Sequence, residues 1–290
     1  MRLVAFKRDG GGPALGMRLD DELVDLTALG LPSTLRPLLE QGADGLASVR
    51  TAATRAKNRI PLSRVAYLPP VIDPAKAIAV GLNYVDHAAE SPYKDAPKYP
   101  VLFHRFPQSW VAHGEPLVRP RVSQQFDYEG EMVVVIGKPG RYIAKERALD
   151  HVAGYSIFND GSIRDYQTKS AQWMMGKNFD RSGSFGPEFV TADELPPGAS
   201  GLRLQTRLNG QVLQDANTRD MIFDVATLIS TLSEAFTLCE GDVIVTGTPS
   251  GVGAARKPPL WMKQGDACEI EIDRLGVLRN GIVDELKLNA

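Results

Sequence analysis

Short apolar runs bounded by glycine, proline or charged residues dominate this sequence, and they limit what the chain can fold into. Each run has the length of one strand, and residues 132–136 are apolar throughout. Residues 225–236 show most clearly the i, i+3, i+4 apolar spacing of a long helix, with Asp224 as the expected N-cap, and the sequence from residue 33 onward is also helix-like. We therefore expect an α+β protein with curved or mixed sheets rather than a repeated strand–helix pattern. The expected strands are residues 76–81, 132–136, 151–158, 202–208, 241–245 and 268–272.

A proline-rich segment divides the chain. Pro69, Pro70 and Pro74 cannot continue a helix or a central strand. We therefore expect a small N-terminal α/β domain at residues 1–70 and a larger domain at residues 71–290. A chain of 290 residues is long enough for two such units.

The overall composition excludes several classes of protein. Lys and Arg number 33 against 35 Asp and Glu, with no basic run, which disfavours a nucleic-acid partner. No apolar run approaches the roughly 20 residues that cross a bilayer, so we expect no membrane partner. The two cysteines, Cys239 and Cys268, form no CxxC pair, which argues against a disulfide scaffold. The first residues lack a secretory-signal pattern, and we expect a cytoplasmic protein.

Three carboxylates stand beside expected strands. Glu129 and Glu131 are two residues apart, so on a strand they point to the same side, with Gly130 adding no bulk between them. Asp160 follows another expected strand. One interpretation is an exposed edge strand whose acids face water. The other is a site where a cation compensates for their repulsion, and three carboxylates without Cys or His favour Mg²⁺ or Mn²⁺ over zinc.

A histidine and a glutamate follow the expected strand at residues 76–81. His87 and Glu90 would touch if the segment is helical, with Asn83 as a possible cap. A carboxylate bonded to one ring nitrogen makes the other nitrogen a better base near neutral pH. The alternative is an ordinary surface pair.

Two further segments could contact an anionic substrate. Lys177 is flanked by small and aromatic residues, so it could be partly desolvated and stabilise an enolate; the alternative is a surface lysine. The glycine-rich turn at residues 246–253 matches neither nucleotide-binding motif, but its backbone N–H groups and the Thr248 hydroxyl could hold a small carboxylate.

The order of these motifs is more specific than any one of them. Between residues 73 and 285 the chain contains, in sequence, Gly-Leu-Asn-Tyr-x-x-His-x-x-Glu, Asp-Tyr-Glu-Gly-Glu, Asn-Asp, Arg-Asp-x-Gln, Gly-Lys-x-Phe-Asp and Thr-Gly-Thr-Pro-x-Gly-Val-Gly. This succession resembles the fumarylacetoacetate hydrolase superfamily, especially its acylpyruvate hydrolase and fumarylacetoacetate hydrolase domain-containing branch. The resemblance implies a mixed β-sandwich roll as the catalytic domain, at residues 71–290, in a homodimer. It also implies that Glu129, Glu131 and Asp160 bind Mg²⁺ or Mn²⁺.

The same resemblance assigns the remaining site residues. It implies that His87 and Glu90 form a water-activating dyad on a lid, which we place at about residues 84–96. It implies that Lys177 is the positive group near the reacting carbon. It also makes Gln167 and Thr248 substrate contacts.

Two segments depart from the family pattern. Relatives often have Lys-Pro where this chain has His-Arg-Phe-Pro at residues 104–107, and Thr-x-x-Pro where it has Arg-Ser-Gly-Ser at residues 181–184. We expect both segments to line the substrate pocket, with Arg105 as a substrate-binding residue. The departures prevent the transfer of one particular substrate.

The resemblance favours a metal-dependent hydrolase that cleaves a carbon–carbon bond in acylpyruvates or related 2,4-dioxo acids and releases pyruvate or a similar oxo acid. We expect a small 2-oxo acid as substrate and a role in aromatic-compound catabolism. One alternative is a decarboxylase or tautomerase of oxaloacetate-like 2-oxo acids, because its reaction passes through the same enolate. The other alternative is a non-catalytic binding protein of the same fold.

Overall fold

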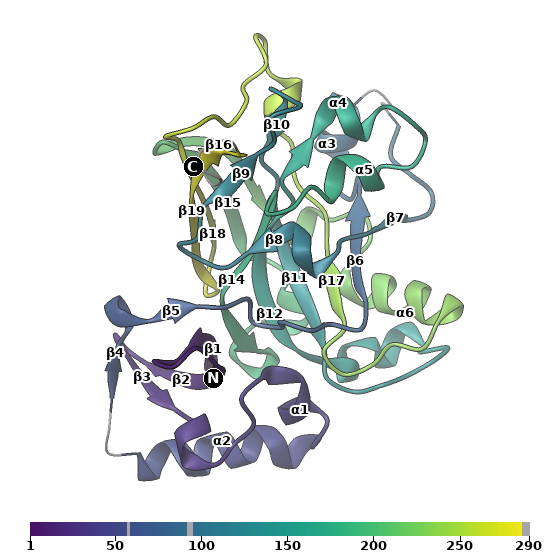
Figure 1. Ribbon diagram of the computed structural model, residues 1–290. Coiled ribbons are helices and arrows are strands. Elements are labelled where there is room, and N and C mark those ends of the chain that lie inside the picture. The colour runs from purple at the N-terminus through teal and green to yellow at the C-terminus, as the bar shows by residue number, and fades with distance from the viewer. Residues whose placement is uncertain (57–58, 92–94, 286–290) are drawn as a thin grey trace.

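The computed structural model describes residues 1–56, 59–91 and 95–285 (Figure 1). In this part of the chain, one large mixed sheet of twelve strands forms the centre of an α+β fold. β5 (Ala66–Tyr67) pairs with β1 (Arg2–Lys7), and β8 (Trp110–Val111) pairs with β14 (Gly183–Thr191), beside the main path of the sheet. That path runs β4 (Ile60–Pro61), β3 (Glu22–Asp25), β2 (Pro13–Leu19), β1 (Arg2–Lys7), β14 (Gly183–Thr191), β12 (Val152–Asn159), β11 (Gly130–Ile136), β17 (Val243–Val245), β6 (Ala77–Gly81) and β7 (Val101–His104).

Smaller sheets and short helices complete the fold. A five-stranded sheet runs β16 (Gln211–Asn217), β15 (Arg203–Leu208), β18 (Ala267–Ile272), β19 (Gly276–Asp284) and β9 (Leu117–Arg119), and β10 (Phe126–Asp127) pairs with β13 (Ser162–Ile163). The α-helices are α1 (Leu35–Leu39), α2 (Ala43–Arg55), α3 (Val85–Glu90), α4 (Arg164–Gln167), α5 (Met174–Lys177) and α6 (Val225–Ala235). The 3₁₀ turns are η1 (Thr27–Leu29), η2 (Leu62–Arg64), η3 (Pro107–Ser109), η4 (Lys145–His151), η5 (Ala192–Glu194), η6 (Pro197–Ala199), η7 (Thr218–Asp220) and η8 (Gly253–Ala255).

The central strand β11 explains why residues 132–136 are apolar throughout. Met132 and Val134 pack in a core with α6 and the five-stranded sheet, whereas Val133 and Val135 pack in a second core on the other face. A strand buried on both faces has no polar positions to alternate with apolar ones. The six expected strands are all present with their ends shifted by at most two residues, and so is the expected helix, α6. Asp224 caps α6 by accepting a hydrogen bond from the Thr227 amide at 2.7 Å.

The N-terminal strands extend the central sheet. β1 pairs antiparallel with β14, with Leu3 opposite Phe189, while α1 and α2 lie below this end of the sheet in Figure 1. Leu3 and Phe189 share one apolar core with side chains from α1 and α2. The division at residues 70 and 71 stays a prediction. Across the described residues, no helix has the length and apolar character that a membrane crossing requires.

Candidate functional site

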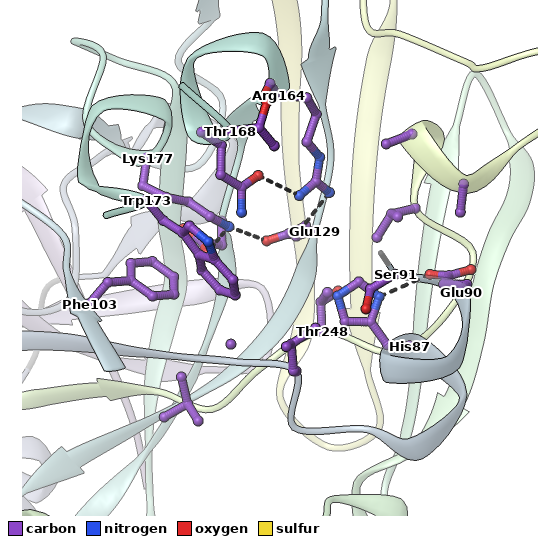
Figure 2. Close-up of a pocket in the computed structure, with 18 of the residues that line it drawn as sticks. His87, Glu90, Ser91, Phe103, Glu129, Arg164, Thr168, Trp173, Lys177 and Thr248 are labelled. Atoms are coloured by element: carbon purple, nitrogen blue, oxygen red, sulfur yellow. Dashed lines mark hydrogen bonds and ion pairs between the residues drawn. The ribbon is translucent and has the colours of Figure 1, made fainter. Parts of the chain in front are cut away.

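A cavity of about 600 Å³ opens where strands β6 and β12 end and strand β11 begins, and helices α3, α4 and α5 contribute to its lining (Figure 2). One part of its lining is charged and the other is apolar. Of the expected site residues, the cavity brings together His87, Glu90, Glu129, Glu131, Asp160, Gln167, Lys177 and Thr248.

Three carboxylates converge in the charged part of the cavity. Glu129 precedes β11, Glu131 belongs to β11, and Asp160 follows β12. The register of β11 against β12 places them side by side, with one oxygen from each carboxylate within 4.8 Å of the others. All three residues are at most 3% exposed. The interpretation of an exposed acidic edge is therefore wrong, because these acids lie in the interior.

Lys177 lies between two of these carboxylates. Its Nζ is 2.5 Å from Oε2 of Glu129 and 2.6 Å from Oδ2 of Asp160. The lysine is 2% exposed, so the alternative of a surface lysine is wrong. Burial of an ammonium at this depth requires such anionic partners.

Arg164 also lines the cavity, although its sequence position alone predicted no role for it. From the first turn of α4, its guanidinium contacts Glu129 at 2.7 Å, Asp127 at 2.8 Å and Oε1 of Gln167 at 2.9 Å. A sequence signal was present, because Arg164 opens the Arg-Asp-x-Gln motif four residues after Asp160. Buried acids at a strand end call for a nearby cation.

The pKa values of Glu129 and Glu131 are shifted in opposite directions. Burial opposes ionisation of Glu129, but the charges of Arg164 and Lys177 outweigh it and hold the pKa of Glu129 well below its usual range. Burial, together with repulsion from Asp160 and Glu129, raises the pKa of Glu131 well above its ordinary value of 4.5. The cluster is therefore short of positive charge around Glu131. Its all-oxygen donor set fits a hard divalent cation such as Mg²⁺ or Mn²⁺.

His87 and Glu90 lie on α3, across the cavity from Lys177 (Figure 2). His87 Nδ1 is 2.9 Å from Oε1 of Glu90, as expected from their spacing. Glu90 also accepts a hydrogen bond from the backbone N–H of Gly251, at 3.0 Å to Oε2. With Nδ1 held by Glu90, Nε2 is the ring nitrogen available to a ligand. Residues 92–94 of the expected lid lie outside the described residues.

The expectation that Asn83 caps α3 is wrong. The N-cap is Tyr84, with no side-chain cap, and Asn83 is fully buried. Its amide donates to the backbone carbonyls of Thr246 at 2.7 Å and Phe223 at 3.0 Å, and its Oδ1 accepts from the Phe223 amide at 2.7 Å. These bonds use the side chain to fix the start of α3 against two distant segments, so it is not available as a cap.

The two expected substrate contacts line the cavity but are already hydrogen-bonded. Gln167 Oε1 accepts from Arg164, so its amide nitrogen is the group left for a ligand. The Thr248 hydroxyl donates to the carbonyl of Gly130 at 3.0 Å and accepts from Gln214 at 2.8 Å. The hydroxyl of Thr248 therefore supports the shape of the site.

Arg105 was expected to bind substrate, but the structure places its side chain outside the cavity. Arg105 is 1% exposed and does not line the cavity. Its Nη1 donates to Oδ1 of Asp160 at 2.7 Å and to the carbonyl of Gly161 at 3.1 Å, from behind the carboxylate cluster. A Cβ at residue 183 would lie 2.4 Å from Arg105 Nη2, so Gly183, in the second departing segment, leaves room for this guanidinium. Arg105 thus holds the carboxylate of Asp160 in position through this hydrogen bond.

Comparisons with known proteins agree with this geometry. Residues 76–283 match the family model "Fumarylacetoacetate (FAA) hydrolase C-terminal". Oxaloacetate tautomerase fahd2, mitochondrial, from Xenopus laevis is 40% identical over 98% of this chain and 90% of its own length. The solved fumarylacetoacetate hydrolase of Exiguobacterium antarcticum is 36% identical, with a TM-score of 0.84 over 98% of this chain and 100% of that one.

A third relative bears on the metal. The maleylpyruvate hydrolase of Sphingobium sp. SYK-6, solved in complex with manganese(II) ion and pyruvate, is 32% identical, with a TM-score of 0.80. The match covers 98% of this chain and 99% of the maleylpyruvate hydrolase chain. The Glu129, Glu131 and Asp160 cluster of this chain is consistent with a divalent metal of the same kind.

Proposed function

Because the chain belongs to the fumarylacetoacetate hydrolase family, in the branch of its domain-containing protein 2 relatives, we propose that it is a metal-dependent tautomerase of 2-oxo acids such as oxaloacetate. The observation that carries the proposal is the meeting of three buried carboxylates, two cations and a glutamate-bound histidine in one cavity. The relative named oxaloacetate tautomerase, 40% identical over nearly the whole chain, supports the choice of reaction. The sequence alone favoured carbon–carbon hydrolysis and left tautomerisation as an alternative. We now propose tautomerisation as the main reaction.

The carboxylate cluster supplies the electrostatic part of the proposal. A divalent cation bound by Glu129, Glu131 and Asp160 would polarise the 2-oxo carbonyl and stabilise the enolate. Lys177 and Arg164 lie on either side of Glu129 and reduce the repulsion that its charge would exert on an anionic substrate.

His87 supplies the proton transfer in the proposal. In the enol-to-keto direction the carbon next to the carbonyl gains a proton and the enol oxygen loses one, so no net proton is consumed. Nε2 of His87 delivers the proton to that carbon in one direction and removes it in the other. Glu90 keeps the ring oriented, because it holds Nδ1 and is itself fixed by the Gly251 amide.

The test follows the decay of the oxaloacetate enol by its ultraviolet absorbance, with Mg²⁺ or Mn²⁺ and then with a chelator. We expect acceleration over buffer that the chelator abolishes and metal restores. His87→Ala should lower the rate by roughly 10²- to 10⁴-fold, the usual cost of losing a general acid–base group. The matched control is His151→Ala, because His151 directly precedes β12, at the end of the strand away from the cavity, and its Nδ1 contacts the backbone carbonyl of Lys138 at 2.9 Å. The absence of acceleration over buffer for every 2-oxo acid enol tested with the metal-loaded enzyme, oxaloacetate included, would refute the proposal.

Hydrolysis of acylpyruvates is the second candidate, favoured by the complete His87–Glu90 pair at 2.9 Å. A histidine held in this way can deprotonate water for attack on a distal carbonyl. Pyruvate release from acetylpyruvate or fumarylpyruvate measures this activity, and CO₂ release from oxaloacetate measures decarboxylation. Lys177→Ala should impair all of these reactions, because each develops negative charge beside that ammonium. His87→Ala should impair decarboxylation least, because that step needs no proton transfer before the bond breaks.

Cellular location and assembly stay predictions. The Xenopus relative is named as a mitochondrial protein, so the cytoplasmic location is not confirmed. The homodimer rests on the family resemblance. Light scattering on the purified chain measures its assembly directly, and a mass of one chain would contradict the homodimer.

A further inference from the structure

An aromatic wall, formed by Phe103 and Trp173, closes one side of the cavity. Phe103 lies in β7 and Trp173 directly before α5, and their rings meet edge to face with centroids 5.7 Å apart. Figure 2 shows both rings on the side opposite His87 and Glu90. Edge-to-face pairs of this kind form stable apolar surfaces.

The backbone of β6 is shaped to hold this wall in place. Gly81 ends β6, and a Cβ there would lie 2.2 Å from Cζ3 of Trp173. Because real side chains do not approach so closely, any other residue at position 81 would displace the indole. The absence of a side chain at Gly81 therefore creates the space in which Trp173 lies.

The wall begins next to the charged part of the cavity. The centroid of the Phe103 ring is 5.0 Å from Nζ of Lys177, and that ammonium contacts both Glu129 and Asp160. The aromatic wall therefore lies within reach of the substituent next to an oxo-acid group held at the carboxylates. A volume of about 600 Å³ leaves room for such a substituent, because cavities of about 300–1,000 Å³ hold drug-sized ligands.

The cations of the cavity are already paired. Among the described lining residues these cations are Lys177, which contacts Glu129 and Asp160, and Arg164, which contacts Glu129 and Asp127. A second substrate carboxylate near the wall would lose water without gaining a cation of its own, which is costly. An apolar ring there would displace water and pack on the rings of Phe103 and Trp173, which is favourable.

From this arrangement we infer that the site selects 2-oxo acids carrying a planar apolar group, such as arylpyruvates, where oxaloacetate carries its second carboxylate. The inference refines the proposed function by naming a substrate class. It concerns recognition, so binding tests it independently of turnover.

The experiment compares two stable oxalyl amides that cannot enolise, N-phenyloxamate and N-oxalylglycine. They share one head group and differ in a phenyl ring against a carboxymethyl group. Calorimetric titration of the Mg²⁺-loaded protein should give at least about tenfold tighter binding of N-phenyloxamate, the gain typical of one buried ring. Equal or tighter binding of N-oxalylglycine would overturn the inference.

Variants of the wall show whether it causes the preference. Trp173→Ala should reduce the ratio of the two affinities to about one, and Trp173→Arg should reverse it by supplying a cation. Met175→Ala is the matched control, because Met175 is 59% exposed on α5 and does not line the cavity. If circular dichroism shows that Trp173→Ala is unfolded, Phe103→Leu provides the same test. An unchanged ratio in a folded wall variant would overturn the inference.

Turnover then separates this inference from the proposed function. The enol decay of phenylpyruvate and oxaloacetate is measured on the same metal-loaded protein. If N-phenyloxamate binds preferentially but neither enol decays faster than in buffer, the tautomerase proposal fails and the recognition stands. If oxaloacetate is tautomerised but N-phenyloxamate is not preferred, the inference fails and the tautomerase proposal stands.

Discussion

Replacing Glu131 by glutamine should stabilise the metal-free protein while removing its response to metal. Glu131 is 1% exposed and lies among carboxylates, and its Oε2 accepts the Gly247 amide at 2.5 Å. A glutamine at this position keeps an oxygen for Gly247. Its amide group can also donate to Asp160 or Glu129, which converts a repulsion into a hydrogen bond.

The magnitude follows from the geometry of the cluster. Two unit charges 4.8 Å apart repel by roughly 3 kcal/mol at an effective dielectric constant of about 20. Asp160 and Glu129 both repel Glu131, and Lys177 cancels about one of these repulsions. We therefore expect Glu131→Gln to raise the free energy of unfolding of the metal-free protein by about 3 kcal/mol at pH 8, the one repulsion that stays uncancelled.

The pH dependence of this effect has a definite sign. The pKa of Glu131 in the folded protein is raised well above its ordinary 4.5, so the folded state retains a proton that the unfolded state releases. The stability of metal-free wild type should fall as the pH rises from 4.5 through that window. Glu131→Gln should lack this decline, and its stability advantage should disappear at pH 4.

Urea unfolding, with a chelator and then with saturating Mg²⁺, measures both effects. With chelator the variant should be the more stable protein. With Mg²⁺ the order should reverse, because binding to the folded state stabilises only the protein that retains the full set of ligands. Glu146→Gln, at an exposed position on η4, is the control and should change neither value by more than about 0.5 kcal/mol. A variant less stable than wild type in chelator at pH 8 would refute the electrostatic reasoning.

Three other predictions concern the rest of the fold. Asp224→Ala should lower the free energy of unfolding by about 1 kcal/mol in urea titrations, because it removes the cap of α6; an unchanged value would show that the cap is dispensable. Burial raises the pKa of the Cys268 thiol to about 12, so iodoacetamide at pH 8 should label half-buried Cys239 and reach Cys268 only after unfolding, as mass spectrometry would show. Burial lowers the pKa of His113, whose Nδ1 accepts from the Arg279 amide at 3.2 Å, so stability should be lost as the pH falls below 6.5. His113→Gln should flatten that pH dependence, and an equally steep loss in the variant would contradict the assignment.

The fold elements could be predicted where local sequence determines burial. The apolar run at residues 132–136 has the length of one strand and no polar position to face water, which favours a strand buried on both faces, and the structure places it between two cores. The pairing of β1 with β14 could not be predicted in the same way. Leu3 and Phe189 are opposite each other across that pair, and nothing near either residue specifies so distant a partner. Sheet order therefore depends on tertiary packing that local pattern does not encode.

The site shows the same division between local and long-range information. Glu129 and Glu131 were identifiable because two neighbouring acids before an apolar strand create an electrostatic cost that something must offset. The residues that offset it were harder to identify, because each lies on another element and only the fold brings it close. Arg105 was assigned to the substrate because its segment departs from the family pattern, yet it pairs with Asp160, 55 positions along the chain.

The balance between carboxylates and cations around the site explains why a metal ion fits this cluster. Four buried carboxylates meet here, those of Asp127, Glu129, Glu131 and Asp160. Within the described residues, the cations that contact them are buried Arg105 and Lys177 and partly exposed Arg164. The cations pair with every one of these carboxylates except Glu131, and burial together with repulsion from Asp160 and Glu129 raises the pKa of Glu131. A divalent cation more than offsets the missing charge and leaves the site attractive to one substrate carboxylate. A second substrate carboxylate would restore the deficit, which is the electrostatic reason to expect an apolar group in its place.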